Sequence, residues 1–219
     1  MDPSAADHDA ERPLRADAAR NRTLILDTAR RVFADRGIGA TLNDVAREAG
    51  VGVGTVYRRF ADKEALLAAL RADKFTALRA LAAAALRVDD PREALRGYLH
   101  EVIALRVRDR LINEVVAASP HDHEALRAER ERLSEDVERV IARARDVGAV
   151  REGFAARDVP VLTLMVGALA DRSASVDPEA WRRYASLLVD AVCPTEEPMP
   201  MPGGPFGEHQ LPLVMHPRP

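Results

Sequence analysis

The sequence lacks most of the features on which membrane-bound, secreted and disulfide-stabilised proteins depend. Its 219 residues include one cysteine, Cys193, which has no second thiol to pair with and which we expect to be inert at a helix end. The longest apolar run, 159–170, is interrupted by Pro160 and Thr163 and is too short to span a bilayer. The N-terminus has no hydrophobic signal core. These absences predict a cytoplasmic protein.

Motifs of catalysis are missing as well. The sequence contains no phosphate-binding loop, no Gly-x-Ser-x-Gly elbow and no spaced set of cysteines and histidines. His121 and His123 could be taken for metal ligands, but residues two apart on a helix point to different faces, and both follow Pro120, where a helix should begin. We therefore interpret them as helix-start residues. The sequence predicts no metal, no cofactor and no enzymatic activity.

Aromatic residues are scarce, at 4% of the chain, whereas hydrophobic residues make up 47%, which is sufficient for a core. Alanine, leucine, arginine and glutamate dominate the middle of the chain. No stretch shows the alternation of apolar and polar residues that is typical of a strand. The length suits one or two domains, and the pattern predicts an all-α fold.

The segment from Thr41 to Lys63 is the most informative part of the chain. Thr41 and Asp44 have the spacing of a capping box, which opens a helix, and Gly50 stands where a left-handed residue would end it. A second helix is expected over 53–60, and Asp62 should cap a third. Two very short helices set at an angle are typical of proteins that read DNA.

The helical wheel of residues 53–60 separates a buried side from an exposed one. Val53, Val56 and Phe60 cluster on one side, which we expect to be buried. Small, hydroxyl-bearing and cationic residues face the other way, with a phenol and a guanidinium on the flanks: Gly54, Thr55 and Arg58, then Tyr57 and Arg59. A major groove admits one α-helix and is bordered by phosphates. Lys63 adds a cation beside helix-terminal N–H groups, which also suit a phosphate.

Ala46, Gly50 and Val56 have the spacing of a helix-turn-helix, and the run 49–60, followed by Asp-Lys-Glu-Ala-Leu, resembles the signature of TetR-family bacterial regulators. The resemblance implies that 53–60 is the recognition helix. It also implies DNA contacts at five positions: Thr41, Thr55, Tyr57, Arg59 and Lys63. Gly52 stands where the family usually has a serine cap, and Arg59 where histidine is frequent. Glycine is an accepted helix cap, so neither departure changes the interpretation.

From the wheel and the resemblance together, Thr55 and Arg58 are expected to contact bases, and Tyr57, Arg59 and Lys63 to contact phosphates. The alternative is a helical hairpin in an unrelated bundle, whose glycines only end helices and whose arginines are solvated. Taken singly, Arg58 could be a plain surface charge. The agreement of caps, turn and outward residues favours the DNA-reading interpretation.

A supporting helix is expected from Arg20 to Arg36, with Gly37 as its terminator. Its apolar residues recur at helical spacing and should pack on the two short helices: Ile25, Ala29, Val32 and Phe33. Residues 20–66 are thus predicted to form a three-helix DNA-binding domain. Residues 1–19 are predicted to be a disordered basic arm, which is either a solvated terminus or a segment that lies along DNA.

Charge is divided unevenly along the chain. From Arg12 to Lys63, eleven basic and six acidic residues give a net charge of +5. Because the whole chain has a net charge of −3, the other residues together carry a net charge of −8. A basic head on an acidic body concentrates the attraction for DNA at one end of the molecule.

Residues 67–193 are predicted to form an antiparallel helical bundle that binds an effector and dimerises, for about nine helices in total. Helices are indicated at 62–88, from Pro91, from Pro120 to about Val147, at 157–172 and at 178–192. Eight prolines in the last 26 residues disfavour helix, so 194–219 is predicted to be a disordered tail.

The helix expected over 157–172 is apolar almost all round, which requires burial on two sides. In TetR-like proteins the last two helices pair with those of a second copy, and this implies a homodimer interface at Leu164, Gly167, Ala168, Trp181, Tyr184 and Leu188. The alternative is burial inside a monomer. A dimer with twofold symmetry implies a palindromic operator on double-stranded DNA.

The resemblance also implies a pocket in the body for a small-molecule effector. The residues that could line it are Leu99, Ile103, Arg106, Asn113, Leu162, Met165 and Leu169. Each of them could instead be ordinary core or surface. The sequence therefore predicts a DNA-binding transcriptional regulator, a repressor released from its operator by an effector. A regulator controlled by a partner protein or by its own concentration, and an architectural DNA binder, are the alternatives.

Overall fold

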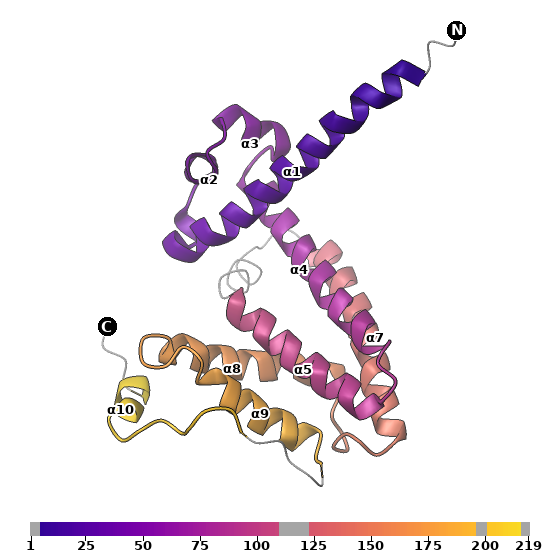
Figure 1. Ribbon diagram of the computed structural model, residues 1–219, viewed down its shortest axis with the longest axis vertical. Helices are drawn as coiled ribbons and strands as arrows, with labels where there is room; N and C mark the ends of the chain where they lie inside the picture. Colours follow the sequence, from indigo (N-terminus) through magenta and orange to yellow (C-terminus); the bar gives the residue numbers. More distant parts are fainter. Residues whose placement is uncertain (1–4, 110–122, 196–200, 216–219) are drawn as a thin grey trace. The chain divides into compact units, whose positions relative to one another are not determined.

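The computed structural model describes residues 5–109, 123–195 and 201–215 (Figure 1). Within these ranges the chain forms nine α-helices, two short 3-10 turns and no strand. The helices are α1 (Ala5–Arg36), α2 (Leu42–Ala49), α3 (Val53–Arg59), α4 (Lys63–Ala85), α5 (Pro91–Arg108), α7 (His123–Asp146), α8 (Val159–Ser173), α9 (Trp181–Val192) and α10 (Gln210–Met215). The predicted all-α fold is confirmed. None of the helices in these ranges is both long and apolar enough to cross a membrane.

The chain divides into two compact units. One comprises the described residues up to Asp73 and the other those from Lys74 onward, so that α4 contributes to both. We refer to them as the head unit and the body unit.

Short capping interactions set the length of α2 and α3 in the head unit. Thr41 and Asp44 form the predicted capping box, and Gly50 ends α2 with a left-handed φ of 66°. The N–H of Val51 then bonds to the carbonyl of Ala46 at 3.1 Å, which is the closing bond of a Schellman motif. Asp62 caps α4 through a 2.8 Å bond from the N–H of Ala65. The predicted caps at Thr41, Gly50 and Asp62 are confirmed.

The core of the head unit joins α1, α2, α3 and the first turns of α4. Its largest fully buried side chains are Ile25, Leu26, Phe33, Val45, Val56, Leu66 and Leu70. The predicted packing of the supporting helix is therefore confirmed. Val53, which the wheel placed on the buried side, is instead 44% exposed. It lies in the first turn of α3, where the core cluster includes Val51 and Val56 but does not extend to Val53.

The helix α1 begins at Ala5, so residues 5–19, which the sequence predicts to be part of a disordered arm over 1–19, are helical in the structure. Alanine and other good helix formers are frequent in this stretch. Extending an existing helix adds one hydrogen bond per residue without a new nucleation cost, and α1 is already held by its buried residues near Ile25.

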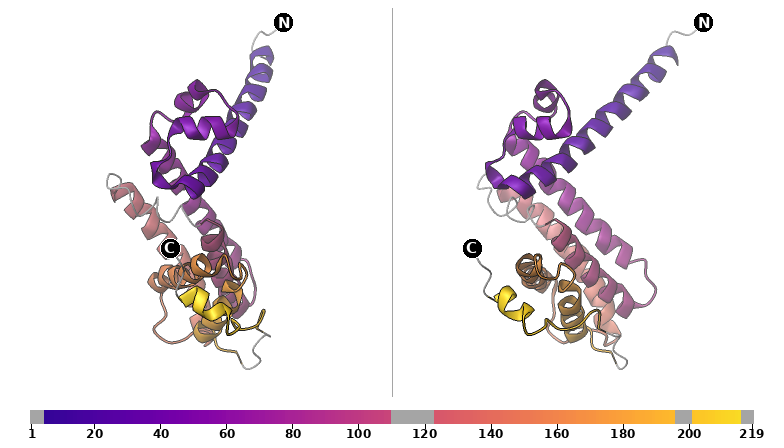
Figure 2. Two further views of the ribbon diagram at one scale, coloured as in Figure 1. Left: turned by 90° about the vertical axis from the view of Figure 1, so that its left-hand side faces the viewer. Right: turned by 60° about the vertical axis from the view of Figure 1, so that its left-hand side comes forward.

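The body unit has a separate core in which α5 packs against α7, α8 and α9. Leu95, Leu99 and Ile103 of α5 are completely buried, as are Ile141 of α7 and Val189 of α9. Asp90 caps α5 through the N–H of Arg92, and Pro91 occupies the first helical position. Figure 2 shows α8, α9 and α10 close together in this unit.

The tail, which the sequence predicts to be disordered over 194–219, is described over 201–215 and includes the helix α10 there. Phe206 stacks on Tyr184 with ring centroids 5.7 Å apart, Arg183 donates to the carbonyl of Gly203, and Val214 of α10 is 3% exposed. Pro212 lies in the first turn of α10, where a backbone N–H has no intrahelical partner to lose. The prolines of the tail therefore do not prevent the short helix α10.

Two glycines of the helix-turn-helix should respond to alanine in opposite directions. Gly50→Ala should lower the free energy of unfolding of the head unit by about 1–2 kcal/mol, because an L side chain is strained at positive φ. Gly54→Ala should raise it by about 0.5–1 kcal/mol, because Gly54 is helical and a Cβ there would meet nothing within 4 Å. Urea unfolding followed by circular dichroism measures both. Equal effects would contradict this account of the turn.

Candidate nucleic-acid interface

The outward side of α3 carries the residues predicted to meet DNA. Gly54, Tyr57, Arg58 and Arg59 are exposed and Thr55 is half-exposed, with Tyr57 at 48%. The opposite side is anchored by Val56, which is completely buried. The short helix α3, labelled in Figure 1, is thus held on one side by the core. Its other side presents a hydroxyl, a phenol and two guanidinium groups.

Arg58 lies back along α3 in the free protein. Its Nε donates to the carbonyl of Gly54 at 3.2 Å, and its Nη2 lies 3.4 Å from the hydroxyl of Thr55. Both bonds are exposed to water, so exchanging them for bonds to a base or a phosphate would cost little. Arg58 and Thr55 thus form one polar surface on α3.

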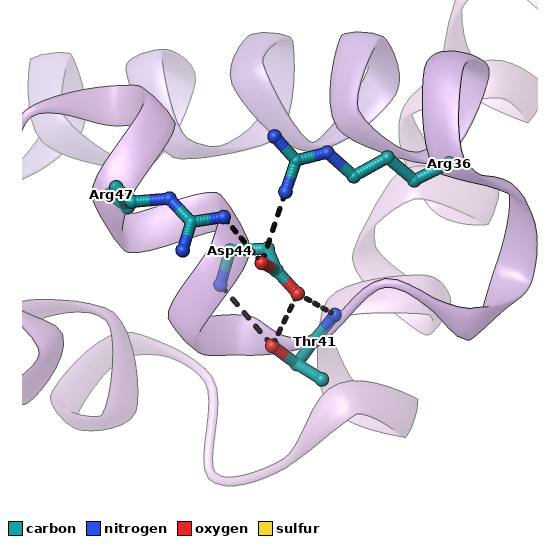
Figure 3. Close-up of polar contacts among 4 residues, drawn as sticks. All are labelled: Arg36, Thr41, Asp44 and Arg47. Atoms are coloured by element: carbon teal, nitrogen blue, oxygen red, sulfur yellow. Dashed lines mark hydrogen bonds and ion pairs between the residues drawn. The ribbon is translucent and has the colours of Figure 1, made fainter.

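The hydroxyl and the N–H of Thr41 are both hydrogen-bonded to Asp44 at the start of α2. Its hydroxyl donates to Asp44 Oδ2 at 2.6 Å and accepts from the N–H of Asp44 at 3.2 Å, while its own N–H donates to the same carboxylate at 3.0 Å (Figure 3). These bonds, with help from Arg47, lower the pKa of Asp44 from its usual 3.8 to about 2. The single hydroxyl proton of Thr41 is therefore already used within the capping box.

The same carboxylate holds two arginines that the sequence reasoning missed. Asp44 Oδ1 accepts from Arg36 at 3.0 Å and from Arg47 at 2.6 Å (Figure 3). Arg36 ends α1, so this pair of bonds connects α1 to the start of α2. The i, i+3 spacing of Asp44 and Arg47 was a visible signal. The contact with Arg36 depends on the way the two helices pack.

Lys63 begins α4 beside the end of α3. Its ammonium nitrogen lies 5.6 Å from the centroid of the Phe33 ring, over the ring face. A cation in this position is attracted by the aromatic quadrupole, which limits the directions that the side chain takes. Lys63 is half-exposed, so its charge remains accessible at the helix N-terminus.

The residues predicted to line an effector pocket lie in different surroundings, and their role in a pocket stays a prediction. Leu99 and Ile103 are completely buried core residues, and Met165 is 52% exposed on the outer side of α8. Leu162 packs against the core, Leu169 is half-buried and Arg106 meets Gly167. Asn113 lies outside the described residues.

The predicted dimer residues also separate into two groups. Leu164 is 59% exposed and Ala168 is exposed, on the same side of α8 as the exposed Val161 and Met165, which the prediction omitted. Trp181 is 6% exposed and belongs to the core of its own protomer. Gly167 is buried, Leu188 packs on the core and Tyr184 is stacked by the tail, so these positions do not form the exposed apolar face.

Two family models match the chain over most of its described helices. The model described as bacterial regulatory proteins of the tetR family matches residues 25–70, and the C-terminal domain model of SbtR-like transcriptional regulators matches residues 90–192. The chain belongs to the TetR family. It is a transcriptional regulator with a helix-turn-helix DNA-binding domain. TetR-family proteins bind DNA, act typically as dimers and are not enzymes.

Individual relatives agree with this assignment. An HTH-type transcriptional regulator of Staphylococcus aureus is 41% identical over 54 residues, which is 24% of this chain and 29% of that protein. The chain therefore matches less than a third of the length of such curated relatives. A TetR regulator from Mycobacterium vanbaalenii has a TM-score of 0.62 and 27% identity, over 83% of this chain and 99% of that one. One from Streptomyces coelicolor has a TM-score of 0.58 and 28% identity, over 80% and 99%.

The capping box can be tested through the pKa of Asp44. In Thr41→Ala we expect this pKa to rise from about 2 towards 3.8, because the largest cause of its depression is the Thr41 hydroxyl. A depressed carboxyl pKa stabilises the fold above pH 3.8, and the effect is lost as the pH falls through 2. The variant should therefore be the less stable protein near neutral pH and approach the wild type at about pH 2.

Carboxyl carbon chemical shifts followed by NMR measure the pKa, and thermal unfolding at several pH values measures the stability. Thr41→Ser keeps the hydroxyl and is the matched control, which should titrate like the wild type. An unchanged Asp44 pKa in Thr41→Ala would show that the cap does not hold this carboxylate.

Proposed function

We propose that this TetR-family protein is a repressor that binds a palindromic operator as a homodimer and is released by a small-molecule effector. The proposal is based on the exposed side of α3. Thr55, Tyr57, Arg58 and Arg59 lie together on a helix too short to be stable alone, whose opposite side is held by the head core. Such a helix suits the width of a major groove.

Within this proposal Thr55 and Arg58 contact bases, and Gly54 allows close approach of the α3 backbone. Tyr57, Arg59 and Lys63 contact the bordering phosphates, where their donors fix the register of the protein on DNA. A phosphate oxygen needs a hydrogen-bond donor, and the hydroxyl proton of Thr41 is given to Asp44. We therefore assign Thr41 the role of holding the N-terminus of α2 in place beside the DNA.

The second copy is proposed to pack on the exposed apolar face of α8. Val161, Leu164 and Met165 are each more than half exposed, and Ala168 follows one turn later on the same side. No charged residue occurs from Val159 to Ala170. Solvation of this face is unfavourable and its burial against an identical face would form a closed, isologous interface. Two recognition helices related by a twofold axis would then read two half-sites.

Release by an effector is proposed to act through α4, because this helix contributes residues to both the head unit and the body unit. Coupling between a ligand site and a DNA site is typically ~1–3 kcal/mol. Loss of operator affinity on adding a ligand would distinguish this regulator from one controlled by a partner protein or by its concentration.

The DNA contacts are tested by footprinting on DNA that flanks the protein's own gene, at several salt concentrations. We expect protection of a discrete palindrome. Lys63→Gln and Arg59→Gln should each weaken binding to all sequences and reduce the salt slope by about one, because each removes a phosphate contact. Thr55→Ala should instead change the preferred base at one position in each half-site.

Arg108→Gln is the matched control, since Arg108 is an exposed arginine of the body unit. It should leave the footprint and its salt slope unchanged. Uniform protection along the DNA would identify an architectural binder and would contradict the repressor.

Dimerisation is tested by placing a charge on the α8 face. Leu164→Glu should convert the dimer to monomer at micromolar concentration, because a carboxylate would be buried in an apolar interface. Leu24→Glu is the control, since Leu24 is an exposed leucine of the head unit, 41% exposed. Sedimentation equilibrium measures both. A Leu164→Glu protein that remains dimeric would place the interface elsewhere.

A further inference from the structure

The exposed apolar side chains of the body unit are concentrated on two of its helices. Twelve large hydrophobic side chains are exposed in the described residues, and six of them lie on α8 and α10: Val161, Leu164, Met165, Leu211, Leu213 and Met215. The other six are scattered over both units. Single exposed hydrophobic residues are ordinary, whereas a contiguous group of them marks an interaction site.

The two groups of side chains lie on neighbouring helices, because α10 packs against α8 (Figure 2). Arg172 shows where they meet, since its Nη1 donates to the carbonyl of Met215 at 3.5 Å. Arg172 is exposed and stands seven residues after Met165, two turns along the same side of α8. The last turn of α10 therefore lies at the C-terminal end of the exposed α8 face. We call the six exposed side chains of these two helices the α8–α10 surface.

The composition of the α8–α10 surface restricts the kind of partner that it suits. No acidic or basic residue occurs in 159–170 or in 210–215. DNA or a strongly charged protein would therefore find no opposite charges on these segments. A second copy of the chain has matching chemistry, because an isologous contact pairs an apolar patch with itself. TetR-family proteins typically act as dimers.

Few contacts hold the tail on its own protomer. Phe206 stacks on Tyr184, Arg183 donates to the carbonyl of Gly203, and Val214 is buried. The other large apolar side chains described on α10 are exposed. A helix of six residues is too short to form alone, and ordering a segment costs conformational entropy that buried surface must offset. A second copy that covers the exposed residues of α10 would add the burial that one protomer supplies only in part.

We propose that α10 extends the dimer interface of α8, so that the tail of each protomer packs against the second copy. The inference rests on the proposed function, because it names a further part of the same homodimer contact. It adds Leu211 and Met215, which lie one turn apart on one side of α10. Both are beyond residues 90–192, the range that the C-terminal family model matches. Folding of the tail and dimerisation then stabilise each other.

The interface is tested by sedimentation equilibrium of the full chain that carries Leu211→Glu and Met215→Glu together. Both residues are exposed in the protomer, so its fold should be retained. We expect the dissociation constant of the dimer to rise about 100-fold, because carboxylates would be buried in an apolar contact. Val147→Glu is the matched control, since Val147 is an equally exposed residue of the body unit outside α8 and α10. It should dimerise as the wild type does.

Hydrogen exchange measures the same coupling without a substitution in the tail. Amides of α10 should exchange about tenfold more slowly in the wild-type dimer than in the Leu164→Glu monomer, because the monomer lacks the second copy that covers them. Amides of the buried part of α7, around Ile141, should exchange equally in both and so show that the body core is intact.

A tail variant that dimerises as the wild type does would overturn the inference. Amides of α10 that exchange equally in the dimer and in the Leu164→Glu monomer would do the same. A wild-type chain that stays monomeric would also overturn it, and would leave the α8–α10 surface to a different protein.

The proposed function has separate outcomes. If Leu164→Glu dissociates the dimer and the tail variant does not, the α8 interface stands and only this inference fails. If the tail variant dissociates the dimer and Leu164→Glu does not, the α8 interface of the proposed function fails, whereas α10 remains at the dimer contact. An intact dimer that protects no palindrome would overturn the repressor alone.

Discussion

The burial of Val56 and Phe60 in the head core is the interaction on which DNA reading depends. The helix α3, which we propose to be the recognition helix, spans seven residues, fewer than an isolated helix needs in water. Its direction is therefore set by these anchors and by the left-handed turn at Gly50, with α1 and α4 as the walls they pack against. The polar residues of α3 can face solvent together because the opposite side is fixed. Without those anchors the same polar residues would have no common direction.

The start of α2 shows how one side chain serves two purposes. Asp44 closes the capping box with Thr41 and also holds Arg36 and Arg47 through its other oxygen. The pKa of Asp44 is lowered first by the hydrogen bonds from Thr41 and then by Arg47, because these donors stabilise the ionised form. Both arginines are thereby paired with one carboxylate at the start of α2, and the hydroxyl of Thr41 is used within the protein. A residue expected at the DNA is thus also part of the scaffold.

The body unit has an apolar core and two further features that this core does not cover or satisfy. One is the apolar face of α8, where Val161, Leu164 and Met165 point away from the protomer. The other is Arg106, which lies against Gly167 with one buried donor unsatisfied. Each feature is costly in the isolated chain, because apolar surface meets water in the first and a polar atom lacks a partner in the second. The first of these features is the face on which we propose that a second copy packs.

The sequence by itself determined the helical class, the caps and turns of the helix-turn-helix, and the outward residues of α3. These features arise from local rules, since a cap acts over three residues and a wheel over a few turns. Tertiary structure decided where Val53, Trp181, Leu99 and Ile103 lie, because burial depends on which element covers a position. It also decided that residues 5–19 extend α1 and that 201–215 fold onto α8 and α9. Composition and proline count are properties of a segment's own sequence, whereas its conformation also depends on the helices against which it packs.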